Sequence, residues 1–155
     1  MAVFHPPTGF HFSVRFENLG LKYPGIEDIG FQEVLGIHSE FGVEEYQEGG
    51  ENRFTHRLPQ PASFPNLVMK RGMLLDSQLV HWFRELVNNF QFDANDCTVI
   101  LLNSDHEPLQ AWNFINAWPV KWSVDGLHAE ENKIMIESIE FAYQYYRRID
   151  PTSIL

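Results

Sequence analysis

Residues 9–17 read Gly-Phe-His-Phe-Ser-Val-Arg-Phe-Glu, and this stretch indicates the fold class of the chain. Every second side chain in it is apolar, whereas the side chains between them are polar. The apolar set consists of Phe10, Phe12, Val14 and Phe16. Alternation with a period of two places one set on each face of a strand. Residues 9–17 are therefore predicted to form a β-strand with one buried face.

Further segments with short apolar runs or alternation predict more strands. They are residues 31–37, 41–46, 53–58, 67–71, 98–103, 109–117, 120–124 and 134–146. Residues 19–30, with Pro24, Gly25 and Gly30, are predicted to be a loop, and the three prolines of residues 59–66 predict a stiff connector. Residues 105–107 predict a turn. In the last segment the apolar positions change from even to odd numbers near Ser138, which predicts a bulge or bend there.

One segment has a different period. Its apolar residues are Leu79, Trp82, Phe83, Leu86, Val87 and Phe90. This spacing predicts an amphipathic helix over residues 77–89, with Asp76 or Ser77 as N-cap. Many short strands and one helix predict a mainly β (α+β) fold, an antiparallel β-barrel or sandwich carrying one flanking α-helix. We expect a single domain spanning residues 1–155.

The segment around residues 41–58 predicts a long hairpin. Gly49 and Gly50 lie between two strand-like runs, and glycine reaches positive φ without strain, so they predict the hairpin tip over residues 47–52. Four carboxylates surround this tip: Glu44, Glu45, Glu48 and Glu51. A solvated surface or a contact between subunits explains such a cluster better than acid–base catalysis does.

Composition limits the classes of function. The chain has 155 residues, of which 44% are hydrophobic, so it can bury a core. Asp and Glu total 21 against 11 Lys and Arg, giving a formal net charge of −10. This excess of negative charge disfavours binding to nucleic acid and to anionic membranes. The sequence shows no signal peptide and no apolar run long enough for a membrane span, and its single cysteine fits a reducing compartment, so a cytoplasmic location is expected.

No catalytic, cofactor-binding or metal site is predicted. The seven histidines, His5, His11, His38, His56, His81, His106 and His128, are isolated from one another. Cys97 precedes an aliphatic run and is expected to be a buried hydrophobe. Residues 104–107, Ser-Asp-His-Glu, are too close together to form a triad, and Gly49-Gly50 lacks the context of a phosphate loop. The 14% aromatic content fits either a filled core or a large permanent interface.

Several segments resemble phage tail tube proteins and the inner tube proteins of extracellular contractile injection systems. They are Phe-Gln-Glu-Val-Leu-Gly at 31–36, Val-Glu-Glu-Tyr-Gln-Glu-Gly-Gly-Glu-Asn-Arg-Phe at 43–54, Pro-Asn-Leu-Val-Met-Lys-Arg-Gly at 65–72, Leu-Leu-Asn at 101–103, Ala-Trp-Pro-Val-Lys-Trp at 117–122 and Ile-Glu at 136–137. The motif at residues 117–122 is similar to the corresponding segment of baseplate-proximal tube proteins, the tube initiator type.

The resemblance implies a structural subunit and no enzyme. Six copies would form a ring, and rings would stack into a hollow conduit for cargo, alongside other tube, baseplate or spike, and sheath proteins. The subunit would assemble in the cytoplasm and then belong to a phage tail-like particle. The resemblance also implies that the hairpin bridges subunits through Glu44, Glu45, Tyr46, Glu48, Gly49, Gly50, Asn52 and Arg53. Two alternatives stay open: a soluble β-barrel that binds a small ligand, and an unrecognised hydrolase.

Overall fold

The computed structural model describes residues 9–17, 25–73, 77–90, 94–125 and 135–154. The strands are β1 (His11–Glu17), β2 (Gly25–Phe31), β3 (Glu33–Leu35), β4 (Glu40–Tyr46), β5 (His56–Ser63), β6 (Leu67–Gly72), β7 (Asn95–Leu102), β8 (Pro108–Val124), β9 (Ile136–Ala142) and β10 (Tyr145–Ile149). The helices are α1 (Gln78–Asn89) and a short 3-10 turn, η1 (Pro151–Ile154). None of the described helices is long and apolar enough to span a membrane.

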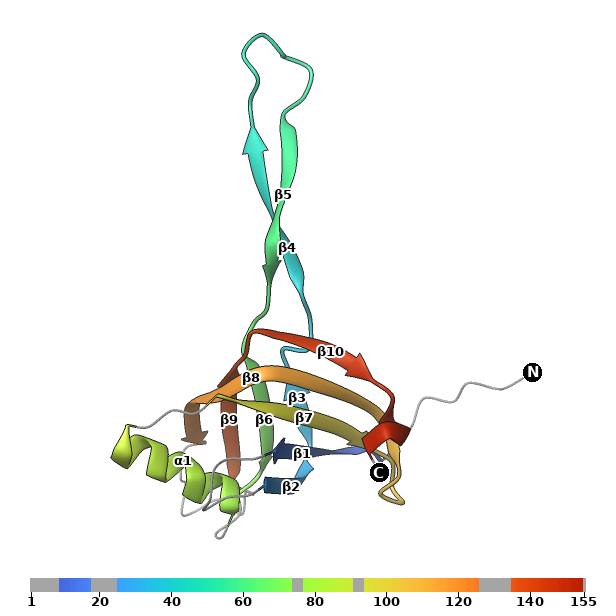
Figure 1. Cartoon of the computed structure of the whole chain (residues 1–155), viewed down its shortest axis with the longest axis vertical. Coiled ribbons are helices and arrows are strands. Elements are labelled where there is room, and N and C mark those ends of the chain that lie inside the picture. The colour runs from blue at the N-terminus through green and yellow to red at the C-terminus, as the bar shows by residue number, and fades with distance from the viewer. Residues whose placement is uncertain (1–8, 18–24, 74–76, 91–93, 126–134, 155) are drawn as a thin grey trace, which may run out of the picture.

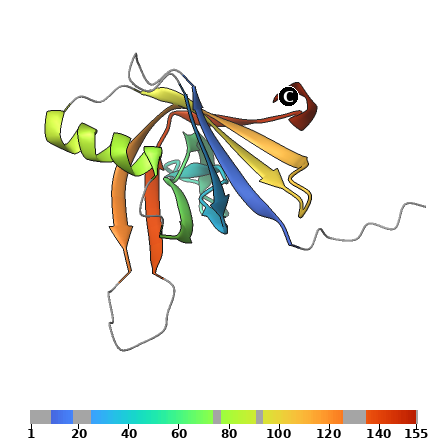
Figure 2. The same cartoon turned by 90° about the horizontal axis from the view of Figure 1, so that it is seen from below.

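Eight strands form one antiparallel sheet, whose order is β2-β1-β7-β8-β9-β6-β3, with β10 also pairing with β8. The two ends of this order, β2 and β3, follow each other directly in the chain, and the amide of Gln32 between them donates to the carbonyl of Lys70 on β6 at 2.9 Å. The sheet therefore curls back on itself, and α1 lies along its flank (Figure 2). This confirms the predicted mainly β fold with one flanking helix.

The core lies between the curled sheet and α1. Phe16 of β1 is fully buried, and its ring centroid lies 5.3 Å from that of Trp82 on α1 and 5.1 Å from that of Phe141 on β9. Val14 is also fully buried, so the predicted inward face of the first strand is confirmed for these two positions. The pairing of strands distant in sequence, together with one helix, thus encloses an aromatic core.

The predicted helix is confirmed as α1, with Ser77 in an extended N-cap conformation. Leu79, Trp82 and Leu86 are buried, whereas Val87 and Phe90 at the carboxyl end are exposed. Phe90 ends the helix in the left-handed region, at φ 50°, and its amide donates to the carbonyl of Leu86. Only part of the apolar stripe therefore reaches the core.

The loop prediction for residues 19–30 was wrong where the structure describes it, because residues 25–31 form β2. Gly30, at φ 96°, is the extra residue in the β1–β2 pairing, since Phe12 faces Phe31 whereas Ser13 faces Ile29. Glycine is suited to such a bulge, so here it marks an irregular strand and not its absence. The strand predicted over residues 31–37 is divided between the end of β2 and the short β3.

Proline also misled the prediction in two places. The connector predicted over residues 59–66 is wrong for its first half, because β5 continues to Ser63 through Pro59 and Pro61. The two strands predicted over residues 109–117 and 120–124 are one 17-residue strand, β8, which passes through Pro119. Both strands have a register shift next to a proline, and β5 has a free edge, where a missing amide donor is tolerated.

The predicted bulge or bend at Ser138 was wrong. Strand β9 keeps one inward face throughout, because its residues Glu137, Ile139 and Phe141 are all buried. The strand ends at Ala142, and the irregularity follows there instead. The inward position that alternation would assign to an apolar residue is occupied by the carboxylate of Glu137. The sheet turns at residues 143–144 before β10 begins.

Candidate assembly interface

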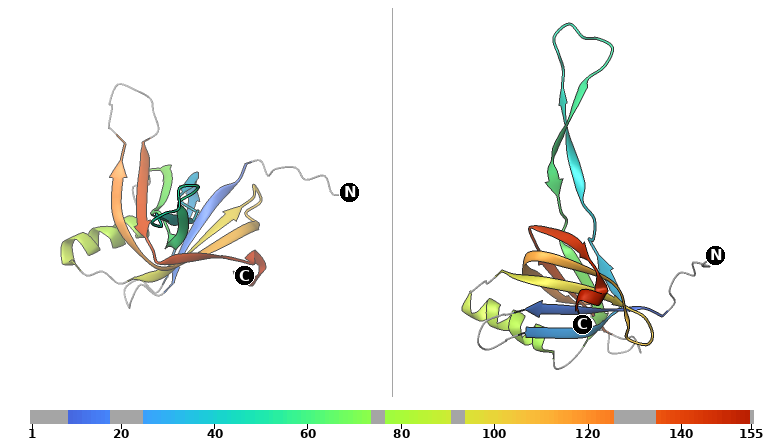
Figure 3. Two further views of the ribbon diagram at one scale, coloured as in Figure 1. Left: turned by 90° about the horizontal axis from the view of Figure 1, so that it is seen from above. Right: turned by 45° about the vertical axis from the view of Figure 1, so that its right-hand side comes forward.

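The β4–β5 hairpin projects far beyond the sheet as a two-stranded ribbon (Figure 1). In the described part of the chain no third strand pairs with it, so both of its edges carry free backbone groups. A turned view shows the same projection (Figure 3). An isolated two-stranded hairpin is at best marginally stable in water. Contact with a neighbour would therefore stabilise the ribbon.

The register of the ribbon gives it two distinct faces. Directly opposed residues share a face, and Glu44 faces Leu58 while Tyr46 faces His56. This first face combines a carboxylate with two exposed apolar side chains, since Tyr46 and Leu58 are 57% and 51% exposed. The second face carries Phe41, Val43, Glu45, Arg57 and Pro59. Exposed apolar groups on both faces indicate a protein contact surface.

The hairpin tip lies where the sequence predicted it. Gly49 and Gly50 form the turn, and Gly50 adopts φ 95°, which requires glycine or a strained residue. The amide of Glu51 donates to the carbonyl of Glu48 at 3.2 Å and closes the turn. The returning strand begins at His56, three residues later than predicted.

Arg53 has its partner within the same hairpin. Its Nη2 lies 2.8 Å from Oε2 of Glu51, and its Nε donates to Oε1 of Glu51 at 2.9 Å. The side-chain hydrogen bond from Arg53 holds the pKa of the Glu51 carboxyl below its usual value. To pair with a carboxylate on a neighbouring subunit, Arg53 would have to exchange this partner or be shared between the two carboxylates.

The other hairpin charges are partly compensated. Glu48 Oε2 lies 3.2 Å from His56 Nε2, and Glu45 lies 3.9 Å from Arg57. Within the described residues, Glu44 has no ion-pair partner. Asn52 is exposed at the tip. The ribbon therefore presents one uncompensated carboxylate on its Tyr46–Leu58 face.

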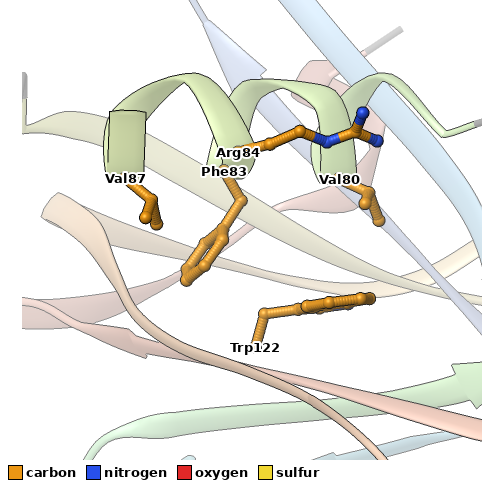
Figure 4. A pocket seen from close by; sticks show the side chains of 5 residues that line it. All are labelled: Val80, Phe83, Arg84, Val87 and Trp122. Atoms are coloured by element: carbon orange, nitrogen blue, oxygen red, sulfur yellow. The ribbon is translucent and has the colours of Figure 1, made fainter. Parts of the chain in front are cut away.

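The flank of α1 carries an open apolar groove of about 240 Å³. Val80, Phe83 and Val87 point from α1 toward the ring of Trp122 on β8, and Arg84 extends along the helix at the edge (Figure 4). Val87 is 61% exposed and Trp122 is 37% exposed. We refer to these five residues as the α1 groove. Phe83 and Val87 belong to the apolar stripe of the predicted helix, and in the structure they line this surface.

A buried ion pair is connected to the groove through Trp122. Arg71 of β6 and Glu137 of β9 are opposite each other, both essentially unexposed, and Arg71 Nε donates to Glu137 Oε1. Arg71 Nη2 donates to the N-cap hydroxyl of Ser77 at 2.7 Å, and Trp122 Nε1 donates to Glu137 Oε2 at 3.3 Å. This cluster joins two strands to α1 and the groove. Sequence reasoning missed it, although the interrupted alternation around Ser138 was its signal.

Among the residues that the structure describes, the groups considered for catalysis or metal binding do not gather into a site. His11 Nε2 and His106 Nδ1 lie 2.9 Å apart on the surface, and in the described part of the chain no group of three or more metal-ligating side chains exists. Burial raises the pKa of the Cys97 thiol, which makes it a poor nucleophile. Residues 103–107 form a turn in which Asn103 Oδ1 accepts from the amides of Asp105 and Glu107. His5 and His128 lie outside the described residues.

Comparison with solved structures identifies the class of protein. The fold matches a chain in the structure of the anti-feeding prophage (AFP) baseplate, with 26% identity, a TM-score of 0.78 and coverage of 96% of this chain and 97% of that one. It also matches a chain in the sheath–tube complex of the PVC extracellular contractile injection system, with 23% identity, a TM-score of 0.72 and coverage of 95% and 93%. Hcp1 from Salmonella typhimurium shares the fold at 12% identity and a TM-score of 0.54, with coverage of 91% and 86%. The fold is that of a tail tube protein.

The family follows from the sequence itself. The family model of the T4-like virus tail tube protein gp19 matches residues 8–147, and the chain belongs to this family. A search of curated protein sequences found no significant match. The chain is a structural subunit of the inner tube of a contractile injection system or phage-like tail, as the resemblance implied.

Proposed function

We propose that six copies of this chain form a ring and that rings stack into the hollow inner tube, with the β4–β5 hairpin as a contact between subunits. The observation that carries the proposal is the ribbon itself. It combines free strand edges, exposed apolar side chains and an uncompensated carboxylate in a protein of the tail tube family. Each of these features is unfavourable in an isolated subunit and favourable once covered.

The structural neighbours support the further partners. They come from a baseplate, a sheath–tube complex and an Hcp protein, so we infer contacts with baseplate, sheath and other tube subunits. The match to a baseplate chain, with the motif at residues 117–122, supports a ring close to the baseplate. Assembly in the cytoplasm, followed by residence in a tail-like particle, fits this role. The net charge of −10 disfavours binding of nucleic acid to the tube wall. It therefore fits a wall along which cargo can move.

Two other functions have weaker support. A small-ligand barrel needs a pocket with convergent polar groups, whereas the α1 groove is apolar apart from Arg84 at its edge. A hydrolase needs a nucleophile near a base, and in the described residues Cys97 is buried with a raised pKa. The structural role that tail tube proteins have therefore remains the best supported, and it requires no enzymatic activity.

The test removes the hairpin tip without touching the sheet. Deletion of residues 48–51, or the change Arg53→Glu, is expected to leave a folded subunit with near-normal circular dichroism that forms few or no stacked rings, because the tip lies far from the core. Native mass spectrometry and electron microscopy should show hexamers and stacked rings for the unmodified protein, and no stacked rings for the variants. Unimpaired stacking would make the tip a dispensable loop, and a strictly monomeric unmodified protein at high concentration would refute the ring.

A further inference from the structure

The α1 groove is an apolar surface with a cation at its edge. Val87 and Trp122 are substantially exposed there, and apolar side chains gathered in one exposed groove are typical of an interaction surface. Arg84 is exposed, and within the described residues it has no ion-pair partner. A ligand for this groove would therefore combine apolar side chains with one carboxylate.

One face of the hairpin has this composition. Tyr46 and Leu58 lie on the same face as Glu44, and Glu44 lacks an ion-pair partner in the described part of the chain. The opposite face differs, because its carboxylate, Glu45, lies near Arg57. The two surfaces are complementary in both apolar character and charge, which is the arrangement that fixes register between proteins.

A subunit cannot join these two surfaces within itself. The ribbon projects from one side of the sheet, whereas α1 lies at the other end of the molecule (Figures 1 and 3). Any contact between the two surfaces would therefore form between two copies, and it would be heterologous, since it would use different surfaces on the two partners. A heterologous contact repeats from copy to copy.

We propose that the Glu44–Tyr46–Leu58 face of one subunit's hairpin docks into the α1 groove of a second copy, with Glu44 paired to Arg84. The proposal rests on the tube function and names the surface that receives the hairpin. The contact holds one ring to the next, so rings and stacks respond differently to its loss.

Charge exchange tests the pairing. Arg84→Glu and Glu44→Arg are each expected to raise the protein concentration needed for stacking about tenfold or more, with hexameric rings retained, because like charges then meet at the contact. The double variant should restore stacking. Lys121→Glu is the matched control, since it makes the same charge change on an exposed cation next to the groove but outside it. Negative-stain electron microscopy and analytical ultracentrifugation distinguish single rings from stacks.

Cysteine cross-linking gives an independent readout. Cys97 is buried, so a Tyr46→Cys, Val87→Cys chain should form disulfides between copies under mild oxidation and give a ladder of covalent multimers. A Val43→Cys, Val87→Cys chain, with its cysteine on the other ribbon face, should give far fewer. Any of three results would overturn the docking while leaving the tube function intact. The first is stacking without the ladder of cross-linked multimers, and the second is normal stacking of both single charge variants. The third is a loss of stacking in Lys121→Glu equal to that in Arg84→Glu. Absence of rings from the unmodified protein would instead refute the tube function.

Discussion

Removing the charge of Glu137 should destabilise the subunit far more than its position on an ordinary strand suggests. The change Glu137→Gln keeps the shape of the side chain but removes the carboxylate charge that lies against the buried guanidinium of Arg71. Loss of one partner from a buried ion pair costs about 3–5 kcal/mol. Arg71 keeps the hydroxyl of Ser77 at 2.7 Å and the ring of Phe31 at 4.6 Å, so we expect the lower end, about 3 kcal/mol.

This loss is large beside the total stability of a domain, which is about 5–15 kcal/mol. Urea unfolding followed by tryptophan fluorescence measures it, because Trp122 donates to Glu137 and Trp82 lies in the core. With a typical dependence on urea, the midpoint should fall by about 1–2 M at fixed protein concentration. A charge-free replacement, Arg71→Met with Glu137→Leu, should be more stable than Glu137→Gln alone, since it removes both buried charges.

The neighbouring strand position provides the control. Lys70 and Glu33 lie 3.2 Å apart with side chains that are 39% and 49% exposed. Solvent screens this pair, so Glu33→Gln should cost less than about 1 kcal/mol. If Glu137→Gln lowers the free energy of unfolding no more than Glu33→Gln does, the argument from burial is refuted.

Two further expectations concern the core. Leu86→Asp should abolish soluble folded protein, because it buries a charge without a partner against the sheet, at a cost of about 3 kcal/mol or more, whereas Val87→Asp on the exposed side of α1 should fold. The soluble yield and circular dichroism check both variants. A folded Leu86→Asp protein would contradict the packing of α1. Cys97 should resist a thiol reagent at neutral pH in native protein and react after unfolding in urea, because burial raises the pKa of its thiol; equal reaction rates in the two states would place it at the surface.

The regular parts of the fold could be predicted from the sequence. Period-two alternation identified β1, and the 3.6-residue spacing identified α1, whose N-cap is Ser77, one of the two residues predicted for it. The glycine pair located the hairpin turn. In these segments local pattern and tertiary environment agree, so the pattern alone is informative.

The failures occurred where partner strands overrode local signals. Residues 25–31 form a strand because β1 pairs with them, despite Gly25 and Gly30. Pro119 lies within β8, and it is placed opposite Phe141 of β9. Strand propensity depends strongly on such neighbours, which a single sequence does not reveal.

The two surfaces of the candidate interface were predictable to different degrees. The hairpin could be found from glycines and carboxylates that are close in sequence. The α1 groove unites Trp122 with Val80 and Val87, more than thirty residues away, and neither segment alone signals that they meet. Glu137 was missed because a carboxylate at an inward position looks like a shift of register until Arg71 is seen opposite it.

The strand order also determines when a newly made chain can fold. β1 pairs with β7, and β6 pairs with β9, so the sheet closes only after residue 142 has been synthesised. Such distant pairing is slow to form, whereas the β4–β5 hairpin involves neighbouring segments and can form early. We therefore expect the ribbon to form and reopen rapidly on nascent chains before the sheet closes, and to become stably ordered only later.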